Sequence, residues 1–267
     1  PTLPPPPSLL SVLVLLAGCS GIIGQPAQEP SSFAPGVSND RVTNATALEA
    51  AHRTILGNTS YTYVSNYTQR VHAEGYHYAV DHDTRVWVAA DGSFRSRHRS
   101  VVTGGNQPSE YVEGVWTNGS IAVTRTVDVS NGTVRYTRYR PPDPYPASSA
   151  TRSDISGSLG DGRLTTTWNE SGSTYGAVHA NSSETRRWQA SNGTVVNLTT
   201  HRSATASIRD DGLVTSLESS FSGSRPLPVA ANRTVESNGR PVARVHDQAT
   251  VRYRALGTTA VPRPDWV

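Results

Sequence analysis

Two-residue Asn-Gly and Asp-Gly turns recur along the chain and constrain its fold more than any other feature. They separate short segments rich in Val, Thr, Tyr and Trp, and they lie at Asp91-Gly92, Asn118-Gly119, Asn131-Gly132, Asn192-Gly193 and Asp211-Gly212. Such pairs readily adopt positive φ, the conformation that joins neighbouring antiparallel strands in a tight hairpin. Their repetition predicts an antiparallel meander, so the fold is expected to be mainly β.

Two further segments show how this sheet is covered. In residues 61–68, Tyr61, Tyr63 and Tyr67 alternate with polar residues, which predicts a strand with one buried and one solvated face. Residues 44–56 carry apolar residues at helical spacing, with Thr43 or Asn44 as cap and Gly57 as the end. Residues 148–176 are rich in Ser, Gly and Thr, and their pattern predicts no particular element.

The N-terminal segment indicates export and lipid attachment. An apolar run from Leu9 to Leu16 is followed by Ala17-Gly18-Cys19, which contains the only cysteine of the chain. Small residues suit the signal peptidase and the thiol suits a lipid transferase, so we expect a signal peptide at 1–18 and acylation of Cys19 by membrane lipid. The alternative is that the cysteine is incidental. Residues 19–40, rich in Gly, Pro, Ser and Ala, are expected to form a flexible tether to one domain at 41–267.

Composition excludes several classes of function. All 24 basic residues are arginine, and with 21 acidic residues the net charge is only +3, which argues against nucleic acid as a partner. A single cysteine allows no intrachain disulfide. The expected protein is stabilised by its core alone. We also expect it to be a monomer on the extracellular face of the cell membrane, held there by its lipid.

Glycosylation is the second modification that the sequence suggests. Ten of the thirteen asparagines begin an Asn-X-Ser/Thr sequon. The strongest candidates are Asn118, Asn131 and Asn192, because hairpin tips are exposed. The alternative is that turn chemistry alone selects these residues, since Asn-Gly is itself the preferred turn pair.

No motif for catalysis or for a cofactor is present. The sequence lacks G-x-S-x-G, H-E-x-x-H and a glycine-rich phosphate loop, so we expect neither an enzyme nor a cofactor. The densest group of possible metal ligands comprises His77, Asp81, His82 and Asp83. We expect no metal there, because a strand would point His77 and His82 to opposite faces.

Arg95, Arg97 and Arg99 alternate along one predicted strand and so share a face. They suit lipid phosphates or an anionic surface glycan. A solvated outer face of the sheet is the favoured interpretation, because arginine is the only cation of this chain.

The aromatic residues are the best candidates for binding. Inward-facing Tyr and Trp can line the cavity of a curved sheet and hold a hydrophobic ligand. The candidates are Tyr61, Tyr63, Tyr67, Trp87 and Trp116. Ordinary packing of the sheet against a helix is the alternative.

Several of these segments together resemble a family of haloarchaeal surface lipoproteins of uncharacterised function. They are the lipobox, the Ala-rich helix before Ser60-Tyr61-Thr62-Tyr63, the NGT hairpins, the late Asp-Asp-Gly-Leu-Val turn and the closing LGTTAVPRPDWV. The fold of that family is similar to the lipoprotein carriers typified by LolA and LppX. The resemblance implies a curved antiparallel sheet, an incomplete barrel, with one or two helices against its concave face.

Two functions follow as hypotheses. The first is a membrane-anchored, non-catalytic binding or carrier module for a hydrophobic ligand, based on the aromatic meander and the resemblance. The second is a glycosylated structural or interaction spacer of the cell envelope, based on the sequons.

Overall fold

The computed structural model describes residues 32–73, 75–105, 108–140, 147, 151, 154–189, 195–226 and 242–267. Cys19 and the proposed signal peptide lie outside the described residues, as do Asn192 and the turn that contains it. In the described part of the chain, no helix has the length and apolar character needed to cross a membrane.

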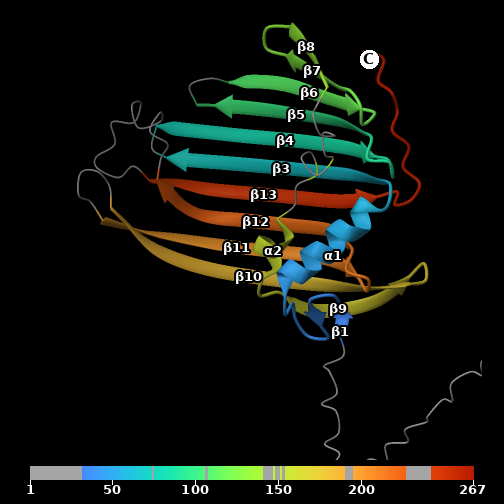
Figure 1. The fold of residues 1–267 in the computed structure, drawn as a ribbon. Helices are drawn as coiled ribbons and strands as arrows, with labels where there is room; N and C mark the ends of the chain where they lie inside the picture. Colours follow the sequence, from blue (N-terminus) through green and yellow to red (C-terminus); the bar gives the residue numbers. More distant parts are fainter. Residues whose placement is uncertain are drawn as a thin grey trace, which may run out of the picture. The chain divides into compact units, whose positions relative to one another are not determined.

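An open antiparallel sheet of eleven strands forms the body of the molecule (Figure 1). Its strands are β3 (Tyr61–Ala73), β4 (Tyr76–Val88), β5 (Phe94–Gly104), β6 (Ser109–Thr117), β7 (Ala122–Asp128), β8 (Thr133–Tyr139), β9 (Arg163–Glu170), β10 (Ser173–Gln189), β11 (Val195–Arg209), β12 (Val214–Pro226) and β13 (Val242–Arg254). Their order is β8-β7-β6-β5-β4-β3-β13-β12-β11-β10-β9. The predicted mainly β fold is confirmed, and the last strand lies in the middle of the sheet beside β3.

The predicted turns explain the local connections. Gly92, Gly119, Gly132 and Gly212 all have positive φ and join consecutive antiparallel strands. In each turn the side chain of the preceding Asp or Asn also accepts backbone hydrogen bonds. Oδ1 of Asn118, for example, accepts them from the N–H groups of Ser120 and Ile121. A sheet of two meanders results, one from β3 to β8 and the other from β9 to β13.

The folded domain begins earlier than the sequence pattern indicates. Residues 32–40, predicted as the end of the tether, include the hairpin of β1 (Ser32–Ala34) and β2 (Val37–Ser38). Ala34 and Val37 are buried in the main core. Phe33, Ala34 and Val37 are too few to define a periodicity, so only their tertiary contacts identify this segment as folded.

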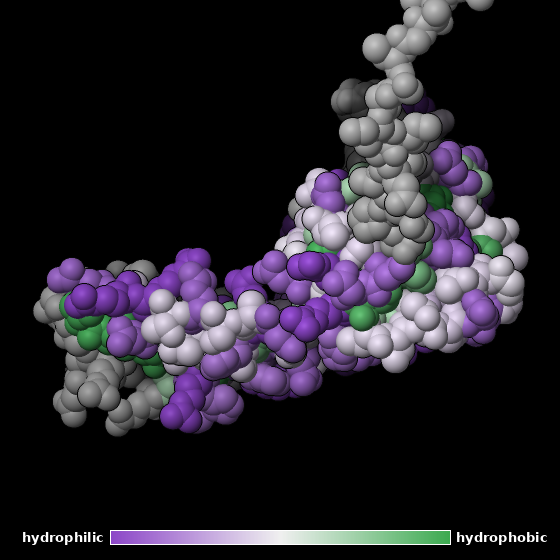
Figure 2. All heavy atoms as spheres, turned by 90° about the horizontal axis from the view of Figure 1, so that it is seen from below, coloured by the Kyte–Doolittle hydropathy of each residue, from purple (hydrophilic) through white to green (hydrophobic). Residues whose placement is uncertain are grey.

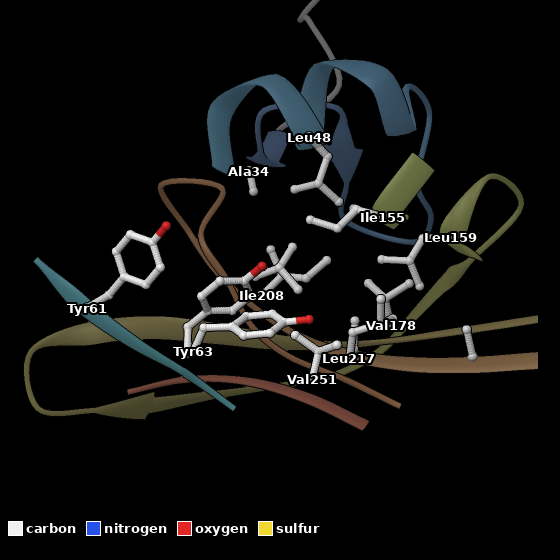
Figure 3. Packing of buried hydrophobic residues seen from close by; sticks show 14 of the residues in the cluster. Ala34, Leu48, Tyr61, Tyr63, Ile155, Leu159, Val178, Ile208, Leu217 and Val251 are labelled. Atoms are coloured by element: carbon white, nitrogen blue, oxygen red, sulfur yellow. The ribbon is translucent and has the colours of Figure 1, made fainter. Parts of the chain in front are cut away.

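Two helices cover one face of the sheet, called here the helix face; the opposite face is called the outer face. They are α1 (Ala45–Gly57), capped by the side chain of Asn44, and α2 (Ile155–Leu159), capped by Asp154. Figure 3 shows Leu48 of α1 pointing toward the sheet beside Ile155 and Leu159 of α2. All three side chains are fully buried. The predicted helix 44–56 is therefore confirmed, and α2 is an element that the sequence pattern did not predict.

A buried histidine joins α1 to the sheet. His52 is 2% exposed, and its Nδ1 accepts a hydrogen bond from the backbone N–H of Val214 at 3.2 Å. Its ring meets that of Tyr253 edge to face, with the centroids 4.7 Å apart. Burial lowers the pKa of His52 to about 4, so the imidazole is neutral in the folded protein.

The helix layer covers only one end of the helix face. Figure 2, seen from the β9 edge, shows described residues rising over one end of the sheet, while the other end extends away with mostly hydrophilic atoms. The helix layer ends at α2, which contacts β10 and β11. The helix face is hollowed beside α2.

Candidate functional site

A pocket of about 480 Å³ lies on the helix face between α2 and strands β10 to β13. Its position follows from the rungs of the sheet, a rung being a row of directly paired residues that point to the same face. The rung beneath the helices is apolar and buried, and consists of Val178, Ala206, Leu217 and Val251. The next rung, called the small rung, consists of Ala180, Ala204, Ser219 and Ala249. These short side chains leave unfilled the space that forms the pocket.

A third rung closes the far side of the pocket with charge and an aromatic ring. It brings Arg202, Phe221 and Asp247 into line on β11, β12 and β13. The Arg202 guanidinium lies 5.7 Å from the centre of the Phe221 ring, within the range of a cation–π contact. Arg225 of β12 also lines the pocket. The pocket therefore combines an apolar floor with a charged rim.

A polar network fixes the side chains at the β3 end of the pocket. The Nη2 of Arg225 donates a hydrogen bond to Oε1 of Gln69 at 3.3 Å, and Nε2 of Gln69 donates to the Tyr67 hydroxyl at 2.8 Å. Burial and then the Asp247 carboxylate raise the pKa of Tyr67, which keeps this hydroxyl protonated. Among the described residues, the buried Oδ1 of Asp247 has no hydrogen-bond donor. This oxygen can accept a hydrogen bond from a ligand.

The opposite wall comes from α2 and the residues around it. Asp154 caps α2 by accepting a hydrogen bond from the N–H of Gly157 at 2.9 Å. This wall is lined by Gly157, Ser158 and Gly160, together with Asp154 and Asp161. The two glycines have no side chain, and that of Ser158 is short. The sequence signal for this wall is a capping Asp154 followed by Ile155 and Leu159 at helical spacing. This signal is weak because the helix has only five residues.

The structure separates the five aromatic residues predicted to bind a ligand. Tyr61 and Tyr63 are each 4% exposed and pack in the main core with the helices. Tyr67 ends the small rung and lines the pocket. Trp87 and Trp116 occupy the outer face, because they pair with Thr62 and Arg95 in rungs that face away from Tyr61 and Tyr63. Of the five, Tyr67 alone lines this pocket.

Histidines of the helix face continue the site beyond Tyr67. The Tyr67 ring stacks on His82 with centroids 5.6 Å apart, and His82 stacks on His98 at 5.1 Å. Burial lowers the pKa of both histidines, and their proximity lowers that of His82 further. The predicted separation of His77 and His82 onto opposite faces is confirmed by their pairing in β4. No group of three or more possible metal ligands occurs within the described ranges.

The two described glycosylation candidates differ in their hydrogen bonds. Both Asn118 and Asn131 are exposed at hairpin tips. The side-chain amide of Asn131 donates to Oδ2 of Asp128 at 2.8 Å, so its nitrogen is engaged in the turn. The Asn118 side chain instead accepts hydrogen bonds from Ser120 and Ile121 with its oxygen, which leaves the amide nitrogen outside these contacts.

Comparison with solved structures finds several proteins that are similar to this chain at very low identity. LprF from Mycobacterium bovis is 10% identical, with 82% of this chain and 96% of that chain covered and a TM-score of 0.35. A putative outer membrane lipoprotein-sorting protein domain from Vibrio parahaemolyticus is 5% identical, with 83% and 92% covered and a TM-score of 0.23. A DUF1329 family protein from Desulfovibrio piger is 12% identical, with 82% and 93% covered and a TM-score of 0.24.

No protein-family model matches the chain, and no curated protein matches it. The solved structures therefore assign no sequence family, and their likeness carries no argument about function. Membership of the haloarchaeal family stays a prediction.

Proposed function

We propose that this chain is a membrane-anchored extracytoplasmic lipoprotein whose domain is a non-catalytic binding module for an amphipathic ligand. The observation that carries the proposal is the pocket itself, where the small rung adjoins a charged rung. An apolar body fits against Ala204, Ala249 and Phe221, while a head group reaches the rim. Its volume of about 480 Å³ lies within the range of small-molecule sites.

The rim defines the head group more closely than the aromatic pattern did. Arg202 and Arg225 offer donors that suit phosphate or carboxylate oxygens. Among the described residues Oδ1 of Asp247 has no donor, so it can accept a hydrogen bond from a hydroxyl or ammonium group. A purely hydrophobic ligand would leave these groups unmatched, so the proposed ligand has an anionic group and a hydrogen-bond donor close together.

Attachment to the membrane is the second part of the proposal and rests on the sequence around Cys19. The thiol is acylated and the preceding residues are removed, so a Cys19→Ser chain is released or retained as precursor. Normal membrane retention of that variant contradicts the anchor.

Glycosylation at Asn118, Asn131 and Asn192 belongs to the same extracellular setting. Asn118 is the site that the described hydrogen bonds favour most, because the residue is exposed and its amide nitrogen lies outside the turn contacts. Such glycans support the alternative role as an envelope spacer only if the pocket takes no ligand.

A pair of adjacent residues tests the binding pocket. Ala204 belongs to the small rung, whereas its neighbour Thr205 pairs with Glu218 on the outer face. Ala204→Phe fills the pocket and Thr205→Phe does not, although both add an aromatic ring to β11. The probe is a single-chain phosphatidylglycerol below its micelle concentration, and isothermal titration calorimetry measures its binding to the Cys19→Ser chain.

We expect the Ala204→Phe change to lower the affinity by at least about tenfold, whereas Thr205→Phe leaves it within about threefold. Equal affinity in the two variants, or no measurable binding to the parent chain, contradicts the proposed site. Urea unfolding of both variants verifies that each remains folded.

A further inference from the structure

Two neighbouring rungs on the outer face form an unusual concentration of cations. One rung carries Arg252, Arg85, Arg97 and Arg125 on β13, β4, β5 and β7. The adjacent rung carries Arg254, Arg95 and Arg138 on β13, β5 and β8. We call these seven residues the arginine ladder. Along the described strands β13 to β8, neither rung contains an Asp or Glu.

The rung beside the ladder contains Glu218 and Asp83, and among the described residues one of the seven ladder arginines has an ion-pair partner. Arg252 forms an ion pair with Glu218 at 3.3 Å. Two other outer-face ion pairs, Arg99 with Glu110 and Arg70 with Asp81, use arginines outside the ladder. Arg85 and Arg97 are directly paired across β4 and β5, and both are exposed. Like charges directly opposite each other repel, so an external anion bound at the ladder reduces the repulsion between its arginines.

Tryptophans lie within the ladder. The Arg85 and Arg95 guanidiniums lie 4.9 Å and 5.4 Å from the centre of the Trp87 ring. The guanidinium of Arg263, in the C-terminal segment, lies 6.0 Å from the centre of the Trp116 ring. Trp266 sits against Gly114, whose added Cβ would be 3.1 Å from the indole Cζ2. Three indoles therefore lie among the arginines, in the part of the outer face that follows β4 to β6.

From this arrangement we infer that the arginine ladder is a docking surface for a membrane rich in anionic lipid. The strands that carry it are spaced by about 4.8 Å, so the ladder extends over roughly 30 Å, which suits a surface of many head groups better than one small anion. Guanidinium groups pair with lipid phosphates, and indoles favour the boundary between apolar chains and water. The choice of a membrane as the partner rests on the proposed attachment near Cys19. The positive charge of the ladder is observed independently of that attachment.

The experiment uses the full chain with Cys19→Ser, so that no acyl group contributes. Co-sedimentation is measured with phosphatidylcholine vesicles, with and without about 30 mol% phosphatidylglycerol, at low salt and at about 0.5 M salt. The apolar segment 9–16 is present in every sample, and only the difference between the two vesicle types reports on charge.

Two triple variants of equal charge separate the ladder from net charge. The test variant is Arg85→Gln, Arg97→Gln and Arg125→Gln; the control is Arg41→Gln, Arg53→Gln and Arg186→Gln, three exposed arginines outside the ladder. At about fivefold for each arginine near an anionic surface, we expect the test variant to bind anionic vesicles roughly 100-fold more weakly. The control stays within about threefold of the parent, and high salt removes the preference of the parent.

Three results overturn the inference: equal binding of the parent to both vesicle types, equal losses in the two triple variants, or tighter binding to single-stranded DNA than to anionic vesicles. Urea unfolding verifies that all chains are folded. Because the pocket is untouched by these variants, phosphatidylglycerol titration of the small-rung site stays unchanged if the two proposals are independent.

Discussion

The two faces of the sheet are formed by the same strands but differ in their side chains and in what covers them. On the helix face, side chains change along each strand from buried and apolar beneath α1 and α2, through the small rung, to the charged rim. On the outer face, two rungs concentrate arginine and tryptophan, and the described helices lie on the opposite face. The difference shows that alternation along a strand determines the face of a residue, whereas its rung determines what surrounds it.

The largest effect is expected where the helix face is fully covered. Leu48 of α1 is 0% exposed, so Leu48→Ala should lower the free energy of unfolding by roughly 2–5 kcal/mol. Val112, half-buried on the outer face of β6, provides the contrast, and Val112→Ala should cost about 1 kcal/mol or less. Urea unfolding measures both. Similar losses at the two positions would mean that the outer face is covered as well.

Acid should weaken the same covered region through His52. Because burial lowers its pKa from 6.5 to about 4 in the folded state, the unfolded chain binds a proton at this residue between these pH values and the folded chain does not. The stability contribution is complete above pH 6.5 and falls with pH by about 1.4 kcal/mol per unit, about 3 kcal/mol in total by pH 4.

Unfolding free energies measured from pH 7 to pH 4 test this expectation. His52→Gln retains an acceptor for the Val214 N–H and should flatten the profile by that amount. His179→Gln, the same substitution at an exposed position of the outer face, is the matched control. A parent slope that persists in His52→Gln would contradict the assignment.

The smallest effect concerns the arginine ladder and has the opposite sign. Arg97 lies directly across from Arg85, so Arg97→Gln should raise the free energy of unfolding by about 0.5 kcal/mol at low salt. Arg187, on the same face of β10, pairs with the neutral Asn197, and Arg187→Gln should change little. A destabilised Arg97→Gln would show that this guanidinium makes favourable contacts in the folded protein.

Local structure could be predicted from the sequence because it is coded by neighbouring residues. The turn pairs predicted the hairpins, and the alternation of Tyr61 and Tyr63 predicted the buried face. The pairing of β13 with β3 depends on residues nearly 200 positions apart, as for Val251 and Ser65, and has no local signal.

The pocket was less predictable for the same reason. Its small rung takes Ala180, Ala204, Ser219 and Ala249 from four different strands, and only their register brings them together. Strand alternation placed Tyr67 on the correct face but could not show that Tyr61 and Tyr63 are covered by helices. Similarly, Arg95 and Arg97 were predicted to share a face, whereas the ladder that includes Arg85 and Arg125 required the pairing of β4 to β7.

Native mass spectrometry of the full chain purified from its own membranes in mild detergent tests the central claim most directly. If the helix face holds an amphipathic ligand, the parent and Thr205→Phe chains should retain a non-covalent adduct that Ala204→Phe loses, and extraction should release a molecule with an anionic group and a hydrogen-bond donor. A parent chain whose mass is that of protein and covalent modifications alone would contradict the account.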